Sequence, residues 1–231
     1  MRKLIFTIFF LATLSYSCYA TTPFVGCPSD GQTGSEPAPT RPTGIIPKDP
    51  SGQLAYYQAK GGPGILAPKG WHCFALEGSD GHQLFVRPEP ISTSDYFNSK
   101  PRWRGITGYG IQVAEMLGDT SGRLAVAKTV ARVFPKYRSY ARSVIAEGIE
   151  PAKDFPFGPY PTDKLTYRSD TFVEFTTPPN TKGIGTDSWI HPNDQSIHGT
   201  IQFAPKGDHE MTAIYLRLPA QFENLIPLIL K

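Results

Sequence analysis

Two mainly apolar runs separated by a tight turn predict two β-strands within residues 66–88. The strands are expected at residues 71–76 and 83–87, and the turn at residues 77–81 reads Glu-Gly-Ser-Asp-Gly. Glycine supplies positive φ angles and aspartate accepts backbone hydrogen bonds, so this composition is typical of a turn between strands. We expect this hairpin to begin the folded domain.

Three further β-runs follow in the second half of the chain, at residues 164–177, 196–204 and 210–218. In the last of them, Met211, Ala213 and Tyr215 alternate with the residues between them, which is the period of a strand. The link at residues 205–208, Pro-Lys-Gly-Asp, is typical of a hairpin turn. The end of the chain is therefore predicted to be a run of antiparallel strands.

Residues 121–147 carry the clearest helical pattern. Their apolar side chains recur at steps of three and four and form one stripe, namely Val126, Val130, Val133, Phe134, Tyr137, Tyr140, Ala141, Val144 and Ile145. Pro135 interrupts the stripe, because it pushes the preceding residue away from helical geometry and suits a first helical turn. We predict helices at residues 122–133 and 135–147, and a last short helix at residues 220–230.

The order of these elements predicts the fold class. The strands flank the helices instead of alternating with them, which favours an α+β fold, an antiparallel sheet with helices packed on one face. Residues 21–53 are rich in proline and nearly free of apolar residues, and we interpret them as a tether, because such a segment cannot bury enough surface to offset its ordering entropy. Residues 54–231 are then predicted to be a single α+β domain.

The N-terminus predicts export. Arg2 and Lys3 precede an uncharged apolar run at residues 4–16, and small residues at Cys18 and Ala20 form a cleavage site. This is the pattern of a secretory signal peptide over residues 1–20, which places the protein in the periplasm or outside the cell. Cleavage removes two bases and no acid, leaving 21 basic against 20 acidic residues. A net charge of +1 gives no electrostatic argument for nucleic acid.

An alternative is a lipoprotein in which Cys18 carries the lipid. A bacterial lipobox has leucine three residues before the cysteine, whereas Ser15 stands there in this chain. The conventional cut after Ala20 is favoured, and the protein would be held at a membrane only if Cys18 were lipidated.

Two cysteines remain after cleavage, Cys27 and Cys73, an even pair that fits an oxidising compartment. We predict a disulfide between them. The alternative is a pair of free thiols, or one reactive thiol next to His72. Adjacent side chains of a strand point to opposite faces, so His72 is badly placed to activate Cys73.

Two motifs resemble those of an uncharacterised family of secreted bacterial proteins. The first is Pro68-x-Gly70-Trp71-x-Cys73 followed by Gly78-Ser79-x-Gly81, and the second is Arg168-Ser169-Asp170-Thr171 followed by Thr177-Pro178 and Gly183-x-Gly185-Thr186. The resemblance implies an exported bacterial protein of one domain, and no activity or site residues. The Pro-x-Gly-Trp entry into a strand pair is also similar to the PsbP/Mog1-like α/β/α sandwich, a likeness of fold alone.

One histidine-rich loop is a candidate metal site. His191, Asp194 and His198 lie within eight residues, and Glu210 opens the next strand. Zinc in a catalytic site takes three protein ligands of these types and keeps one open position. The alternative is a polar loop in which Asp194 caps a turn and both imidazoles face water, which the lack of a recognised ligand spacing favours.

Basic residues on the predicted helices are a candidate binding surface. Lys128, Arg132 and Lys136 are spaced by four residues, and Arg138 continues the basic side. Such a surface could bind an acidic ligand. The alternative, which we favour, is the solvated face of an amphipathic helix. Arg102 and Trp103 would add to the surface by bidentate contacts and stacking.

Two other segments are interpreted as loops. Residues 183–186, Gly-Ile-Gly-Thr, lack the helix and the lysine of a phosphate loop and are expected to be a flexible link between strands. Residues 151–161 alternate proline with Phe155, Phe157 and Tyr160, and they form either a ligand lid or a cover over the edge of the core, the second being favoured.

These patterns contain no catalytic residues that rise above a structural interpretation, and they imply no cofactor. We expect an exported bacterial binding or accessory protein of the envelope or medium, inhibitor-like or immunity-like, without catalytic activity. Its partner would be an envelope protein or an acidic ligand. The alternative is a metal- or carboxylate-assisted hydrolase that uses the loop of His191, Asp194 and His198.

Overall fold

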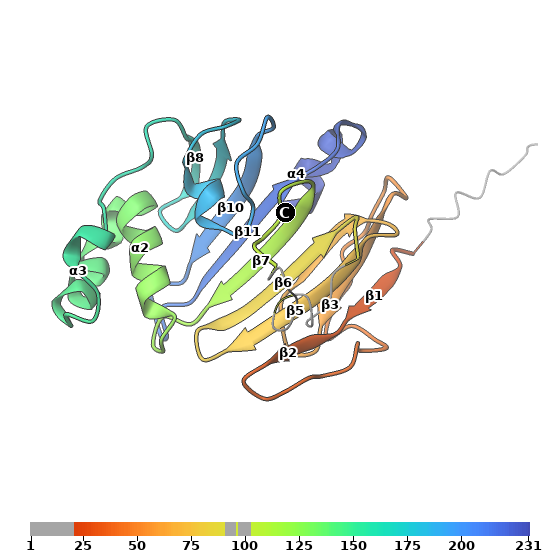
Figure 1. Cartoon of the computed structure of the whole chain (residues 1–231), viewed down its shortest axis with the longest axis horizontal. Coiled ribbons are helices and arrows are strands. Elements are labelled where there is room, and N and C mark those ends of the chain that lie inside the picture. Colours follow the sequence, from red (N-terminus) through yellow and green to blue (C-terminus); the bar gives the residue numbers. More distant parts are fainter. Residues whose placement is uncertain (1–20, 91–95, 97–102) are drawn as a thin grey trace, which may run out of the picture.

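Two β-sheets form the body of the protein (Figure 1). The computed structural model describes residues 21–90, 96 and 103–231. Within these residues the larger sheet has eight strands in the order β2-β5-β6-β7-β11-β10-β9-β8, and the smaller sheet has three in the order β1-β3-β4. The strands are β1 (Phe24–Cys27), β2 (Ser29–Gly31), β3 (Leu54–Ala59), β4 (Gly64–Pro68), β5 (His72–Gly78), β6 (Gly81–Arg87), β7 (Gly110–Met116), β8 (Lys164–Ser169), β9 (Phe172–Thr177), β10 (Ile197–Phe203) and β11 (Met211–Arg217).

Antiparallel pairing dominates, as the sequence predicts. Only β1 with β3 and β2 with β5 run parallel among the strand pairs of the described residues. The predicted hairpin is β5–β6, with Gly78 opposite Gly81. Gly81 has a φ of +130°, and a Cβ there would lie 2.0 Å from the carbonyl oxygen of Glu115 on β7, so the turn requires glycine at this position.

The helices whose bounds lie within the described residues are α2 (Arg123–Val133), α3 (Arg138–Ala146) and α4 (Ile226–Ile229), with short 3₁₀ turns at η1 (Pro135–Tyr137), η2 (Ala152–Asp154), η3 (Ile184–Asp187) and η4 (Ala220–Leu225). The predicted break at Pro135 is confirmed. Phe134 leaves helical geometry at φ −117° and ψ 79°, and Pro135 opens the next turn. The predicted helix at residues 220–230 is a 3₁₀ turn followed by one turn of α-helix.

Each face of the larger sheet is covered by a different layer. On β7, Ala114 belongs to the core beneath α2 and α3, whereas Ile111 and Val113 belong to the core shared with the smaller sheet and α4. This alternation follows from the two-residue period of a strand. Figure 1 shows α2 and α3 on one side of the larger sheet and β1 and β3 on the other. The α+β prediction is confirmed, and the PsbP/Mog1-like likeness is not confirmed.

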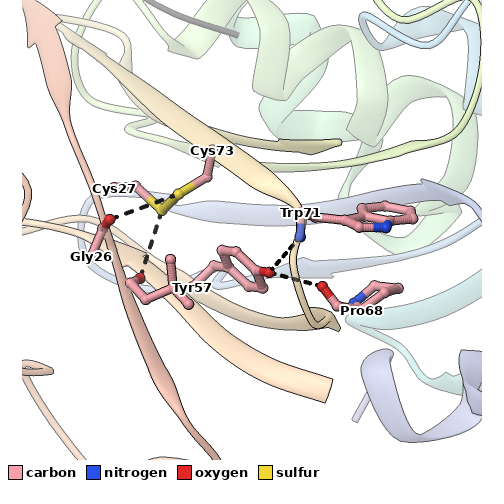
Figure 2. The surroundings of a disulfide bond; sticks show 7 residues. Gly26, Cys27, Tyr57, Pro68, Trp71 and Cys73 are labelled. Atoms are coloured by element: carbon pink, nitrogen blue, oxygen red, sulfur yellow. Dashed lines mark hydrogen bonds between the residues drawn. A yellow bond between two sulfur atoms is a disulfide. The ribbon is translucent and has the colours of Figure 1, made fainter. Parts of the chain in front are cut away.

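A disulfide joins the two sheets, as predicted. Cys27 ends β1 of the smaller sheet and Cys73 lies in β5 of the larger sheet, with their Cα atoms 5.4 Å apart (Figure 2). Tyr57 lies beside the disulfide, where its hydroxyl donates to the carbonyl oxygen of Pro68 at 2.8 Å and accepts from the Trp71 amide at 3.1 Å. The bridge and these hydrogen bonds hold the smaller sheet against the start of the hairpin.

The structure corrects the interpretation of residues 21–53 as a tether. β1 pairs with β3 and β2 pairs with β5, so the first part of the expected tether belongs to the two sheets. Further along, buried Asp49 accepts hydrogen bonds from the amides of Ser51 and Leu54. Strand pairing and a covalent bond order this segment despite its few apolar residues. Between these anchors the segment lies at the surface, where Ile45 is 95% exposed.

No helix in the part of the chain that the structure describes is long and apolar enough to cross a membrane. Residues 1–20, the predicted signal peptide with Cys18, lie outside the described residues.

Candidate functional site

A groove runs beside α2 on the helix-bearing face of the larger sheet. It consists of two adjoining hollows of about 430 and 470 Å³, and both are lined by Met116, Ala125, Asp187 and Tyr215. Volumes of this size are typical of sites that hold small ligands. We define the groove by the residues that line these two hollows.

Strands β6, β7 and β11 supply the floor of the groove. Gln83, Gln112 and Tyr215 line it from these three neighbouring strands. Gln112 is buried, and its Nε2 donates to Oε1 of Gln83 at 2.9 Å while its own Oε1 accepts from the Trp189 amide at 2.7 Å. The floor is therefore a fixed polar surface that also holds the wall in place.

The wall is formed by residues 184–191, which include η3. Asp163 organises this segment, because its Oδ2 accepts from the Ile184 amide at 2.8 Å and its Oδ1 accepts from the Thr177 hydroxyl at 2.7 Å. The same Thr177 oxygen accepts from the Gly185 amide at 2.9 Å. The expected flexible link at residues 183–186 is thus an ordered turn, and the turn delivers Asp187 into the groove.

Asp187 is the central charged group of the groove. Its carboxylate is exposed to the solvent of the groove, yet protein surrounds it on the other sides, and its Oδ1 accepts a hydrogen bond from Tyr160 at 2.8 Å. Burial raises the pKa of Asp187, and the charge of Asp163 adds to this. The Tyr160 hydroxyl and the charges of Arg132 and Lys182 lower the pKa again only in part.

The Asp187 carboxylate also contributes to the raised pKa values of two tyrosines. Burial and the contact with Asp187 raise the pKa of Tyr160 to about 12. Burial and the charge of Asp187 also raise the pKa of Tyr215, which is 4% exposed and lines both hollows. Both phenols therefore stay protonated at physiological pH and can donate hydrogen bonds.

One end of the groove is cationic. The Arg132 guanidinium lies 3.8 Å from the ring centroid of Tyr160, and the Lys182 ammonium lies 5.9 Å from the same centroid. Lys153 lines this end as well, together with Lys128, which is paired with Glu150 at 2.6 Å. Three of the four cations at this end therefore have no ion pair with an acid among the described residues.

We expect replacement of Asp187 by Asn to stabilise the free protein at neutral pH. A raised carboxyl pKa means that the folded protein holds the proton more tightly than the unfolded chain, so ionisation opposes folding. This penalty grows as the pH rises through the folded pKa and disappears below the ordinary value of 3.8. Denaturant unfolding from pH 4 to pH 8 measures it. Asp208→Asn, a change at an exposed turn, is the control, and an Asp187→Asn variant that is less stable at neutral pH would contradict the assignment.

The predicted basic surface is divided by the fold. Lys128 and Arg132 reach the groove, whereas Lys136 pairs with Asp170 in the link between β8 and β9 and Arg138 lies over the ring of Phe157 at 5.8 Å. The loop at residues 151–161 supplies the aromatic rings that lie against these cations, namely Phe155, Phe157 and Tyr160. Arg102 lies outside the described residues.

Trp103 supports the groove wall and does not extend a basic surface. Its ring stacks on Trp189 with centroids 5.3 Å apart and meets Phe85 edge to face at 5.2 Å. The aromatic cluster fixes Trp189, which lines the groove.

The described residues do not group His191, Asp194 and His198 as ligands of one metal ion. His191 lines the groove and its Nε2 contacts the Arg104 carbonyl oxygen, so the ring proton lies on Nε2. His198 lies on β10, where its Nδ1 contacts the Thr176 hydroxyl at 3.2 Å, and burial lowers its pKa. Across the described ranges, no three His, Cys, Asp or Glu side chains are grouped to hold a metal ion. His191 and His198 thus have different hydrogen-bond partners although they are close in sequence.

Sequence reasoning missed the centre of the groove. Asp187 follows the Gly-Ile-Gly-Thr segment and belongs to no motif, and Tyr215 reads as an ordinary core residue of a strand. The aromatic loop gave one usable signal, since Tyr160 was a candidate for a ligand lid. No protein-family model, curated protein or solved structure matches the chain.

Proposed function

We propose that the protein is an exported binding protein whose ligand occupies the groove. The observation that carries this proposal is Asp187, a solvent-accessible carboxylate with a raised pKa set between Tyr160, Tyr215 and a cationic end. A titratable group with a perturbed pKa in a concave site is a candidate for a functional site.

Binding is favoured over catalysis by the contacts of the two side chains that resemble a nucleophile and a base. The Ser188 hydroxyl donates to the Gly185 carbonyl oxygen at 2.6 Å and accepts from the Ile190 amide at 3.0 Å. His191 uses Nε2 for the Arg104 carbonyl oxygen. The Ser188 hydroxyl is therefore occupied by the backbone and makes no hydrogen bond to His191, whereas a nucleophile needs a base within hydrogen-bond reach.

Export is supported by the disulfide, because such bonds persist in oxidising compartments. Together with the signal peptide predicted at residues 1–20, this favours the periplasm or the medium over the cytosol. An inhibitor-like or accessory role in the envelope, and kinship with uncharacterised secreted bacterial proteins, remain predictions.

A thermal-shift screen tests the proposal. The purified mature protein is heated with a panel of neutral and acidic sugars, organic acids, short peptides, polyamines and nucleotides. A ligand at a hundred times its Kd is expected to raise the melting temperature by about 5 °C or more. The shift should vanish in Asp187→Asn and persist in Asp208→Asn. A panel without any shift, or a shift that Asp187→Asn retains, would refute the groove as the binding site.

A further inference from the structure

We propose that the ligand of the groove is an acidic saccharide, with its hydroxyl groups between Tyr215 and Asp187 and its anionic substituent at the cationic end. This inference rests on the proposed binding function and assigns the chemical class of the ligand. It follows from four features of the groove. These are the Tyr215 hydroxyl, the Asp187 carboxylate, the polar side chains of the floor, and the cations at one end that have no ion pair with a described acid.

The unused hydroxyl belongs to Tyr215. The side chain is 96% buried, it lines both hollows, and its phenolic oxygen makes no hydrogen bond to any described residue. This oxygen is not fully buried, so it is accessible from the groove. A buried polar group is normally hydrogen-bonded, and one that opens only into a groove is ready for a ligand.

The neighbours of Tyr215 match the hydrogen-bonding pattern of sugar hydroxyls. A sugar hydroxyl donates one hydrogen bond and accepts others. Asp187 can accept from such a group while Tyr215 donates to it, and Gln83 keeps its amide nitrogen as a further donor because its Oε1 is occupied by Gln112. Ala114 and Met116 supply apolar lining against which the carbon face of a sugar ring can pack.

The anionic substituent is assigned by the charges at the other end. Arg132, Lys153 and Lys182 line this end without an ion pair to a described acid, and Asp154 and Asp187 are the acids that line it with them. Arg132 is held against Tyr160 and its Nη1 donates to the Gly158 carbonyl oxygen at 3.3 Å, so its guanidinium is positioned before any ligand arrives. A fixed guanidinium suits a carboxylate, and lysines add charge around it.

Calorimetric titration with defined sugars tests the inference. The probes are trigalacturonic acid, an alginate trisaccharide and a hyaluronan tetrasaccharide, each paired with a neutral counterpart in which the carboxylates are methyl-esterified. At least one acidic probe should bind, and its ester should bind more weakly by a factor of about ten or more.

Two variants separate the two halves of the ligand. Tyr215→Phe should weaken the acid and its ester alike by about ten-fold, because it removes a hydrogen bond that both make. Lys182→Met should weaken the acid and leave the ester unchanged. The matched controls are Tyr137→Phe, at a tyrosine packed on Phe203 outside the groove, and Lys206→Met in an exposed turn.

The inference is overturned if no acidic probe binds, or if each acid and its ester bind equally. It also fails if Lys182→Met weakens both equally. A ligand from the thermal-shift panel that is not a saccharide, and whose binding is lost in Asp187→Asn, would contradict the saccharide class alone. The proposed binding function would still hold.

Discussion

Replacing Arg217 by Met is expected to lower the free energy of unfolding by about 3–5 kcal/mol. Arg217 is 1% exposed at the end of β11, and its guanidinium donates to three backbone carbonyl oxygens. These belong to His191 at 2.6 Å, Gly108 at 3.1 Å and Thr107 at 3.4 Å. The side chain therefore ties the segment before β7 to the end of the groove wall. Methionine fills much of the space but leaves the carbonyl groups without donors.

Arg217 remains charged at neutral pH, so its lowered pKa does not remove the expected loss of stability. Burial lowers the pKa of Arg217, and the charge of Asp194 acts in the opposite direction, but a guanidinium with an ordinary pKa of 12.5 stays protonated at neutral pH. Denaturant unfolding at pH 7 measures the loss. The matched control is Arg168→Met, which breaks an exposed pair with Glu174 and should cost much less stability than Arg217→Met. Equal losses for the two variants would contradict a structural role for the buried guanidinium.

Removing the disulfide is expected to lower the free energy of unfolding by up to about 4 kcal/mol. Cys27 and Cys73 are 46 residues apart, so their bond restricts a long loop of the unfolded chain. In the folded protein the bond fastens β1 and β2, which lie at the edges of their sheets and pair there with β3 and β5. The double variant Cys27→Ala with Cys73→Ala should therefore also become open to proteolysis within residues 21–53.

Reduction provides the control for this prediction. Dithiothreitol should bring the wild type down to the stability of the double variant and should leave the double variant itself unchanged. A double variant as stable as the oxidised wild type, with residues 21–53 still protected, would show that strand pairing alone holds this segment.

The fold was predictable from local patterns to the extent that those patterns have a single structural solution. The hairpin of β5 and β6 follows from two mainly apolar runs on either side of a glycine-containing turn, and the end of α2 follows from Pro135. The interpretation of residues 21–53 was wrong for β1 and β2. Composition measures how much apolar surface a segment can bury, but not whether a sheet edge and a cysteine are available to order it.

The candidate site was far less predictable. Proximity in sequence suggested His191 and His198 as partners, and the structure places them in unrelated contacts. The groove instead joins Arg132, Asp187 and Tyr215, which come from a helix, a 3₁₀ turn and a strand. Their meeting depends on the position of β11 between β7 and β10, which no local pattern contains.

The amino-acid sequence by itself determined the two-residue period of the strands, the break between the helices, the α+β class and the pairing of Cys27 with Cys73. Each of these depends on neighbours along the chain or on the small number of cysteines. Tertiary structure alone decided the strand order, the ordering of the N-terminal segment and the environment of Asp187. A pKa and a groove depend on which distant residues surround a point in space, and packing sets those distances.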